Sequence, residues 1–165
     1  MDVFKHRMSL SLAFLAVAAT VLLLAGNAAA TAVDLCKQTD SFPKLCKSVI
    51  EGTTDPKKAT ELAIKALIVE TERVKLAAKK LGKSEELDVC NEVIDDAIDN
   101  LNGALQFLKS NEERSLNDYL SAVLTDFVTC NDAYEEMGKT SPFAKTTETA
   151  KNMASNCLAL ASQIH

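Results

Sequence analysis

A row of carboxylates at helical spacing is the feature of this sequence best suited to binding chemistry. Asp88, Glu92, Asp96 and Asp99 fall at i, i+4, i+8 and i+11. In a helix they project from one side along about 16 Å, and like charges so spaced repel one another mildly. Such a row is either an ordinary solvated helix face or a surface that binds a basic partner.

The other side of the same stretch is apolar. Its apolar residues are Leu87, Cys90, Ile94, Ala97, Leu101, Leu105 and Leu108. Because they recur every three or four positions, they predict a helix over residues 87–108 that packs against other helices.

Residues suited to catalysis are scarce in this chain. Histidine occurs only at His6 and His165, and no C-x-x-C pair is present, so neither a zinc site nor a histidine-based active site is expected. Paired acids such as Asp95 and Asp96 could do acid/base chemistry, but on an exposed helix they lack a concave pocket. We therefore expect no enzyme activity, no metal and no cofactor.

The first 30 residues resemble a secretory signal. The charged start contains Lys5 and Arg7, an apolar run spans residues 10–25, and small residues end at Ala30. Cleavage is expected after Ala30 or after Ala32, with an uncleaved anchor as the alternative. We expect residues 1–30 to be removed and residues 31–165 to form one domain, divided into 31–52 and 53–165.

The domain that remains is acidic. Removing Asp2, Lys5 and Arg7 from totals of 23 acidic and 18 basic residues leaves 22 and 16, a net charge near −6. Such a chain has little attraction for nucleic acid phosphates or anionic lipid. We therefore expect a protein partner, no nucleic acid and no membrane contact after cleavage.

Five cysteines lie in a chain expected to reach an oxidising compartment. Five choices of unpaired cysteine and three pairings of the rest leave fifteen connectivities. Two segments too short to form stable helices flank Phe42-Pro43, so a bridge from Cys36 to Cys46 would stabilise a helical hairpin there by roughly 2–3 kcal/mol.

Helix start and stop residues divide the remaining chain into four long helices. Asp55 and Pro56 begin the first, which Gly82 should end, and Ser84 begins the second. Ser115 with Asp118 resembles a capping box at the start of the third, and Gly138 ends it. Ser141-Pro142 opens the fourth.

Apolar residues at helical spacing support these four helices. They are Leu62, Ala63, Ala66, Leu67, Val74, Ala77 and Leu81 in the first; Leu116, Leu120, Val123, Phe127, Cys130, Tyr134 and Met137 in the third; and Ala150, Met153, Cys157, Leu160 and Ile164 in the fourth.

Short connectors between four helices imply antiparallel neighbours and an up-down-up-down bundle. Cys90 near the start of the second helix would then lie beside Cys130 near the end of the third, and a bridge between them would contribute about 4 kcal/mol. Cys157 remains as a free thiol, either a buried small hydrophobe or a reactive or intermolecular group.

Taken together, these features resemble the plant invertase and pectin methylesterase inhibitor family. The features are the C-x9-C hairpin from Cys36 to Cys46, the segments Leu87-Asp88-Val89-Cys90 and Asp95-Asp96-Ala97-Ile98-Asp99-Asn100-Leu101, and the run from Leu120 to Cys130. The resemblance implies a secreted all-α protein, a helical hairpin followed by a four-helix bundle, with Cys36–Cys46 and Cys90–Cys130 disulfides. It also implies a monomer in the free state.

Within the family the sequence is more similar to the pectin methylesterase inhibitors. The Pro-Lys-Phe element of invertase inhibitors is absent from the connector at residues 110–115, and Pro43-Lys44-Leu45 lies in the hairpin instead. Matches to the esterase inhibitors run through the segments Asp96-Ala97-Ile98-Asp99, Gln106-Phe107-Leu108 and Ser115-Leu116-Asn117.

The resemblance also implies a partner and a contact surface. The partner is a plant pectin methylesterase in the apoplast, whose pectin-binding cleft the bundle covers in a one-to-one complex. The matching contact positions are Glu92, Asp96, Asp99, Asn117, Thr129 and Asp132. The alternatives are an inhibitor of acid invertase in the cell wall or vacuole, and a secreted bundle without inhibitory activity, such as a receptor ligand or a small-molecule carrier with an internal cavity.

Overall fold

The computed structural model describes residues 35–37 and 42–164, and every regular element in these residues is helical. Residues 35–37 form a short helical turn. The longer helices are α2 (Pro43–Val49), α3 (Pro56–Ala78), α4 (Glu85–Ser110), α5 (Glu113–Glu136) and α6 (Ala144–Ala161). In this part of the chain, no helix is both long enough and apolar enough to cross a membrane.

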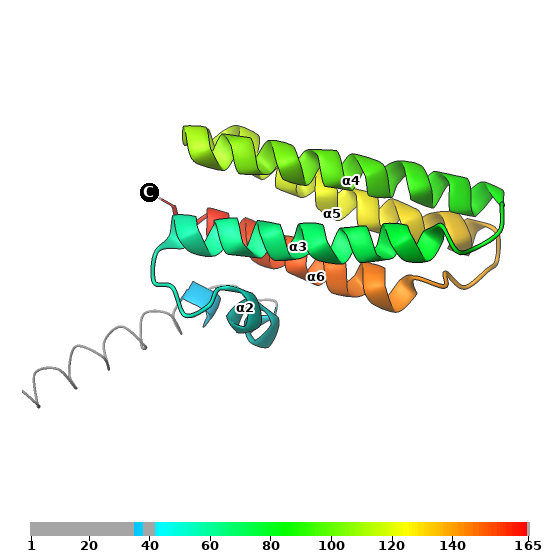
Figure 1. Ribbon diagram of the computed structural model, residues 1–165, viewed down its shortest axis with the longest axis horizontal. Coiled ribbons are helices and arrows are strands. Elements are labelled where there is room, and N and C mark those ends of the chain that lie inside the picture. The colour runs from blue at the N-terminus through cyan, green and yellow to red at the C-terminus, as the bar shows by residue number, and fades with distance from the viewer. Residues whose placement is uncertain (1–34, 38–41, 165) are drawn as a thin grey trace, which may run out of the picture.

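Helices α3 to α6 form the predicted up-down-up-down bundle. Each packs against the next helix in sequence, and α6 closes the ring against α3. Connectors alternate between the two ends of the bundle, and α2 lies at the end where α3 begins (Figure 1). The helices are antiparallel neighbours because connectors this short cannot return along the bundle.

The core consists of two groups of buried residues, each containing one disulfide. Cys36 and Cys46 join the hairpin to the larger group, to which α3, α4, α5 and α6 all contribute. Cys90 and Cys130 join α4 to α5 in the smaller group at the other end, with a Cα–Cα distance of 4.4 Å. Both predicted disulfides are therefore confirmed, and so is the all-α fold.

The first predicted helix start is correct, but its predicted end is not. The Asp55 side chain accepts a hydrogen bond from the Lys57 backbone N–H at 3.0 Å, as a capping residue does. The helix stops at Ala78 rather than at Gly82, because the Lys80 and Leu81 N–H groups bond three residues back. Leu81 consequently lies outside the core, with 43% of its surface exposed.

The capping box predicted at Ser115 and Asp118 is also wrong. Asn111 adopts a left-handed conformation with φ of 60°, and the Glu112 N–H bonds to the Phe107 carbonyl at 3.0 Å. The chain thereby reverses within two residues, so α5 begins at Glu113 and Ser115 lies inside it. At the other end of α5, Met137 falls beyond the helix and is exposed rather than buried.

The predicted signal, its cleavage after Ala30 or Ala32, and the hairpin residues 38–41 lie outside the described residues. The division of the chain at residues 30 and 52 likewise stays a prediction. The described hairpin residues pack through Cys46 and Ile50 onto α3 and α6.

Candidate partner-binding surface

The acidic row, defined as Asp88, Glu92, Asp96 and Asp99, lies exposed along α4. The opposite side of α4 is buried, so the predicted division of this helix into a core side and a charged side is correct. Leu105 is the one member of the predicted apolar stripe that is only partly buried. The carboxylates are therefore held on a rigid helix with access to a partner.

Next to the acidic row, α4 and α5 meet along a line that we call the α4–α5 seam, defined by Asn100, Gly103 and Phe107 on α4 and by Tyr119 and Asp126 on α5. Asn100 Nδ2 donates a hydrogen bond to Asp126 Oδ2 at 3.1 Å. Partial burial raises the pKa of Asp126, and the nearby Asp96 carboxylate raises it further. Asp96 therefore belongs both to the acidic row and to the border of the seam.

The other half of the seam is aromatic. The Tyr119 ring lies against the α4 backbone at Gly103, where an added Cβ would be 2.6 Å from Tyr119 Cδ1. Phe107 packs against the same ring, with centroids 4.9 Å apart. The close approach explains why α4 contains a glycine in its interior, where this residue otherwise weakens a helix.

The three predicted contact residues on α5 do not all lie on one side. At about 100° per residue, Thr129 is about 60° from Asp126 around the helix, Asp132 about 120°, and Asn117 about 180°. Thr129 thus lies close to the seam and Asp132 faces outward. Asn117 is on the other side of α5 and is not brought together with Glu92, Asp96 and Asp99.

Ion pairs fix the position of α4 in the bundle. Lys75 Nζ on α3 lies 2.8 Å from Asp95 Oδ1, and this contact raises the pKa of Lys75. Lys139 Nζ lies 2.7 Å from the buried Glu86 carboxylate and, with backbone and Ser84 hydrogen bonds, lowers the pKa of Glu86 to about 2. The neighbouring residues Asp95 and Asp96 therefore have different roles: Asp95 pairs with α3, whereas Asp96 belongs to the exposed acidic row.

Cys157 is fully buried between α6 and its neighbours and carries the free thiol. Burial raises its pKa to about 12. Because the thiolate is the reactive form, this environment supports the interpretation of Cys157 as a small hydrophobe over a reactive group.

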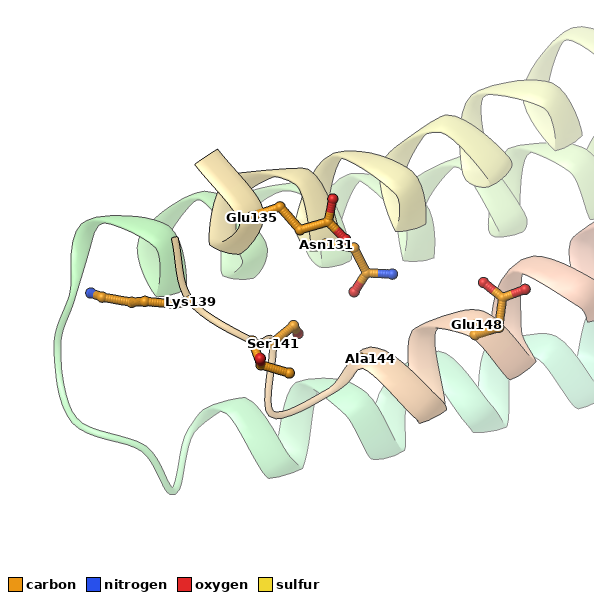
Figure 2. Close-up of a pocket in the computed structure, with 7 residues that line it drawn as sticks. Asn131, Glu135, Lys139, Ser141, Ala144 and Glu148 are labelled. Atoms are coloured by element: carbon orange, nitrogen blue, oxygen red, sulfur yellow. The ribbon is translucent and has the colours of Figure 1, made fainter. Parts of the chain in front are cut away.

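A polar hollow of about 330 Å³ lies away from the seam, at the turn between α5 and α6 (Figure 2). Asn131 and Glu148 reach into it, and Thr147 Oγ1 donates to Asn131 Oδ1 at 2.8 Å. The hollow is open and lined by charged side chains, whereas a carrier of the kind considered above needs an apolar cavity inside the bundle. The described residues hold no group of acids, histidines and cysteines arranged to bind a metal ion.

The sequence-based prediction of contact residues missed all five residues of the seam: Asn100, Gly103, Phe107, Tyr119 and Asp126. Gly103 gave the available signal, because a glycine inside a long helix often marks a close approach of another group. Which residues face α5 depends on the rotation of both helices, and periodicity gives that only approximately.

The fold and this surface together define a disulfide-linked helical bundle that presents an acidic and aromatic face. Residues 30–160 match the family described as plant invertase/pectin methylesterase inhibitor, and the chain belongs to that family. Among solved structures, a mutant form of a pectin methylesterase inhibitor from Arabidopsis is similar to this chain, with a TM-score of 0.68 and 16% sequence identity. The match covers 79% of this chain and 94% of the inhibitor chain.

Two curated relatives from Arabidopsis thaliana are each 30% identical to this chain. Pectinesterase 1 is matched over 79% of this chain and 27% of its own length. Pectinesterase inhibitor 6 is matched over 68% of this chain and 60% of its own length. The chain therefore spans about a quarter of the first relative and less than two thirds of the second.

Proposed function

We propose that this chain is a secreted, apoplastic inhibitor of pectin methylesterase that covers the pectin-binding cleft in a reversible one-to-one complex. The observation that carries the proposal is the acidic row, exposed on a helix of a chain that belongs to this inhibitor family. The similarity to pectinesterase inhibitor 6 supports an esterase as the target. The two disulfides and the signal-like residues 1–30 support secretion.

Charge complementarity gives the physical basis. A cleft that holds polygalacturonate, an acidic polymer, must offer basic and hydrogen-bonding groups. The carboxylates of Glu92, Asp96 and Asp99 can meet those groups in place of the substrate, with Thr129 and Asp132 beside them. Such charges mainly set the orientation and the rate of encounter.

The helices supply area and rigidity. A 26-residue helix such as α4 extends about 39 Å, and with α5 beside it this face can bury the 1,200–2,000 Å² or so of a stable interface. Ion pairs and a disulfide already fix α4, so little conformational freedom is lost on binding.

The test is a pair of inhibition assays on the protein secreted from its full-length gene. Titration against a plant pectin methylesterase should give saturable one-to-one inhibition, and the same protein should leave acid invertase active. Inhibition of invertase alone would assign the chain to the other activity named in the family description. A folded protein inactive against both enzymes would support the non-inhibitory alternative.

A further inference from the structure

Tyr119 is a large exposed side chain held in one place. Its exposed fraction is 37%, although one side of the ring lies on the α4 backbone at Gly103 and Phe107 packs against it. A side chain fixed in this way pays little entropy when it is buried in an interface.

The position of the ring relates it to the charged groups of the seam. Tyr119 precedes Asp126 by seven residues, and Asp96 precedes Gly103 by seven, so each pair lies on one side of its helix about 10.5 Å apart. Because α4 and α5 are antiparallel, the aromatic half of the seam continues directly from the half formed by Asn100 and Asp126.

Two other large exposed apolar side chains lie on α3, away from the seam. Val69 and Leu76 are more than half exposed and lie on α3, seven residues apart. They are ordinary surface residues and serve as controls.

Building on the function proposed above, we infer that Tyr119 is the anchor of the inhibitor, inserting beside the acidic row into the basic cleft of the esterase. Basic groups of the cleft that approach the acidic row can also lie near the Tyr119 ring, which attracts a cation. Tyrosine is among the residues enriched at the few interface positions that dominate affinity, and these positions are fully desolvated in the complex. The acidic row then governs encounter, whereas Tyr119 governs dissociation.

Chemical footprinting tests this inference without any mutation. The chain contains two tyrosines, and Tyr134 is only 5% exposed with a pKa raised by burial. Mild iodination of the free protein should therefore modify Tyr119 in preference to Tyr134. Peptide mass spectrometry after adding saturating pectin methylesterase should show Tyr119 protected. Equal modification of Tyr119 in the free and bound protein would overturn the inference.

Variants provide the second test. Tyr119→Ala should raise the dissociation constant about 30-fold or more, through a faster dissociation rate and with an unchanged salt dependence. Tyr119→Leu keeps an apolar side chain on α5 that can pack against α4, so it separates the loss of packing from the loss of recognition. Leu76→Ala, a matched truncation on α3, should leave binding unchanged, and circular dichroism should confirm the folded fraction of each variant.

Each outcome has a separate meaning. If the parent protein binds no pectin methylesterase, the proposed function fails and the role of Tyr119 fails with it. If the parent is bound but Tyr119→Ala and Tyr119→Leu, both folded, dissociate at the parental rate, the esterase proposal stands and the anchor is refuted.

Discussion

Gly103 has no room for a side chain because the Tyr119 ring occupies the space above it. Alanine favours a helix interior over glycine by about 1 kcal/mol, but overpacking a contact costs about 1–3 kcal/mol. Gly103→Ala should therefore bring no gain in stability while Tyr119 is present. In a Tyr119→Ala background the same substitution should raise the free energy of unfolding by about 1 kcal/mol. Urea unfolding of the four proteins measures this coupling, and an equal gain in both backgrounds would contradict the packing described.

Asp126 is half-buried next to Asp96, and both burial and the neighbouring charge raise its pKa. With its pKa raised in the folded state, the native protein binds more protons than the unfolded chain between the two pKa values, so stability falls as pH rises through that window. Asp126→Asn should therefore increase the melting temperature at pH 7, and still accept the hydrogen bond from Asn100. The gain should vanish below about pH 3, where both states are protonated. A gain of equal size at pH 3 and pH 7 would exclude this charge effect.

At the scale of the element, Lys139 in the α5–α6 connector holds the first turn of α4 through Glu86. Because the pKa of Glu86 is lowered to about 2, its contribution to stability is complete above the unfolded pKa and is lost as pH falls from about 4.5 to 2. Lys139→Met should lower the melting temperature at pH 7. The difference in melting temperature between the variant and the parent should shrink as pH falls from about 4.5 to 2. Lys145→Met, an exposed lysine of α6, is the control and should change little. A deficit independent of pH would assign the loss to packing rather than to charge.

The helices were predictable from sequence to the extent that local chemistry decided them. Asp55 caps α3, and the predicted apolar residues within α4, α5 and α6 are buried, apart from the partly buried Leu105; Met137 and Ile164 fall beyond the ends of their helices. The α4–α5 connector was not predictable in this way, because the left-handed Asn111 and the bond from Glu112 to Phe107 outweigh the capping signal at Ser115. The Gly103–Tyr119 contact depends on how α4 and α5 are rotated against each other. The residue pattern of either helix alone does not determine that rotation.

At the scale of the whole molecule, each of the two groups of core residues contains one disulfide. Cys90 and Cys130 are 40 residues apart and Cys36 and Cys46 are 10 apart. On the loop-entropy model, replacing the first pair by alanine should cost about 4 kcal/mol and the second about 3 kcal/mol. Urea unfolding at neutral pH compares them. Loss of the short-loop bridge should not cost more than loss of the long one, and the reverse order would show that native packing rather than loop closure sets the effect.

The proposed function depends on the acidic row of α4 being the surface that contacts the esterase. One inhibition measurement tests this most directly. In a titration of pectin methylesterase, the double variant Asp96→Lys/Asp99→Lys should inhibit at least tenfold more weakly than the parent. This loss of inhibition should depend more strongly on salt concentration than the loss caused by Tyr119→Ala. Its fold should be kept, since both side chains are exposed and lysine suits a helix.

The matched control is Glu70→Lys/Glu148→Lys, which makes the same change in net charge on α3 and α6. Among the ion pairs of the described residues, it breaks those with Arg73 and Lys151, which lie on the surface, so stability should change little. We expect the control to inhibit pectin methylesterase like the parent while the α4 double variant does not. Equal inhibition by the folded α4 variant and the parent would contradict the assignment of the acidic row as the contact surface.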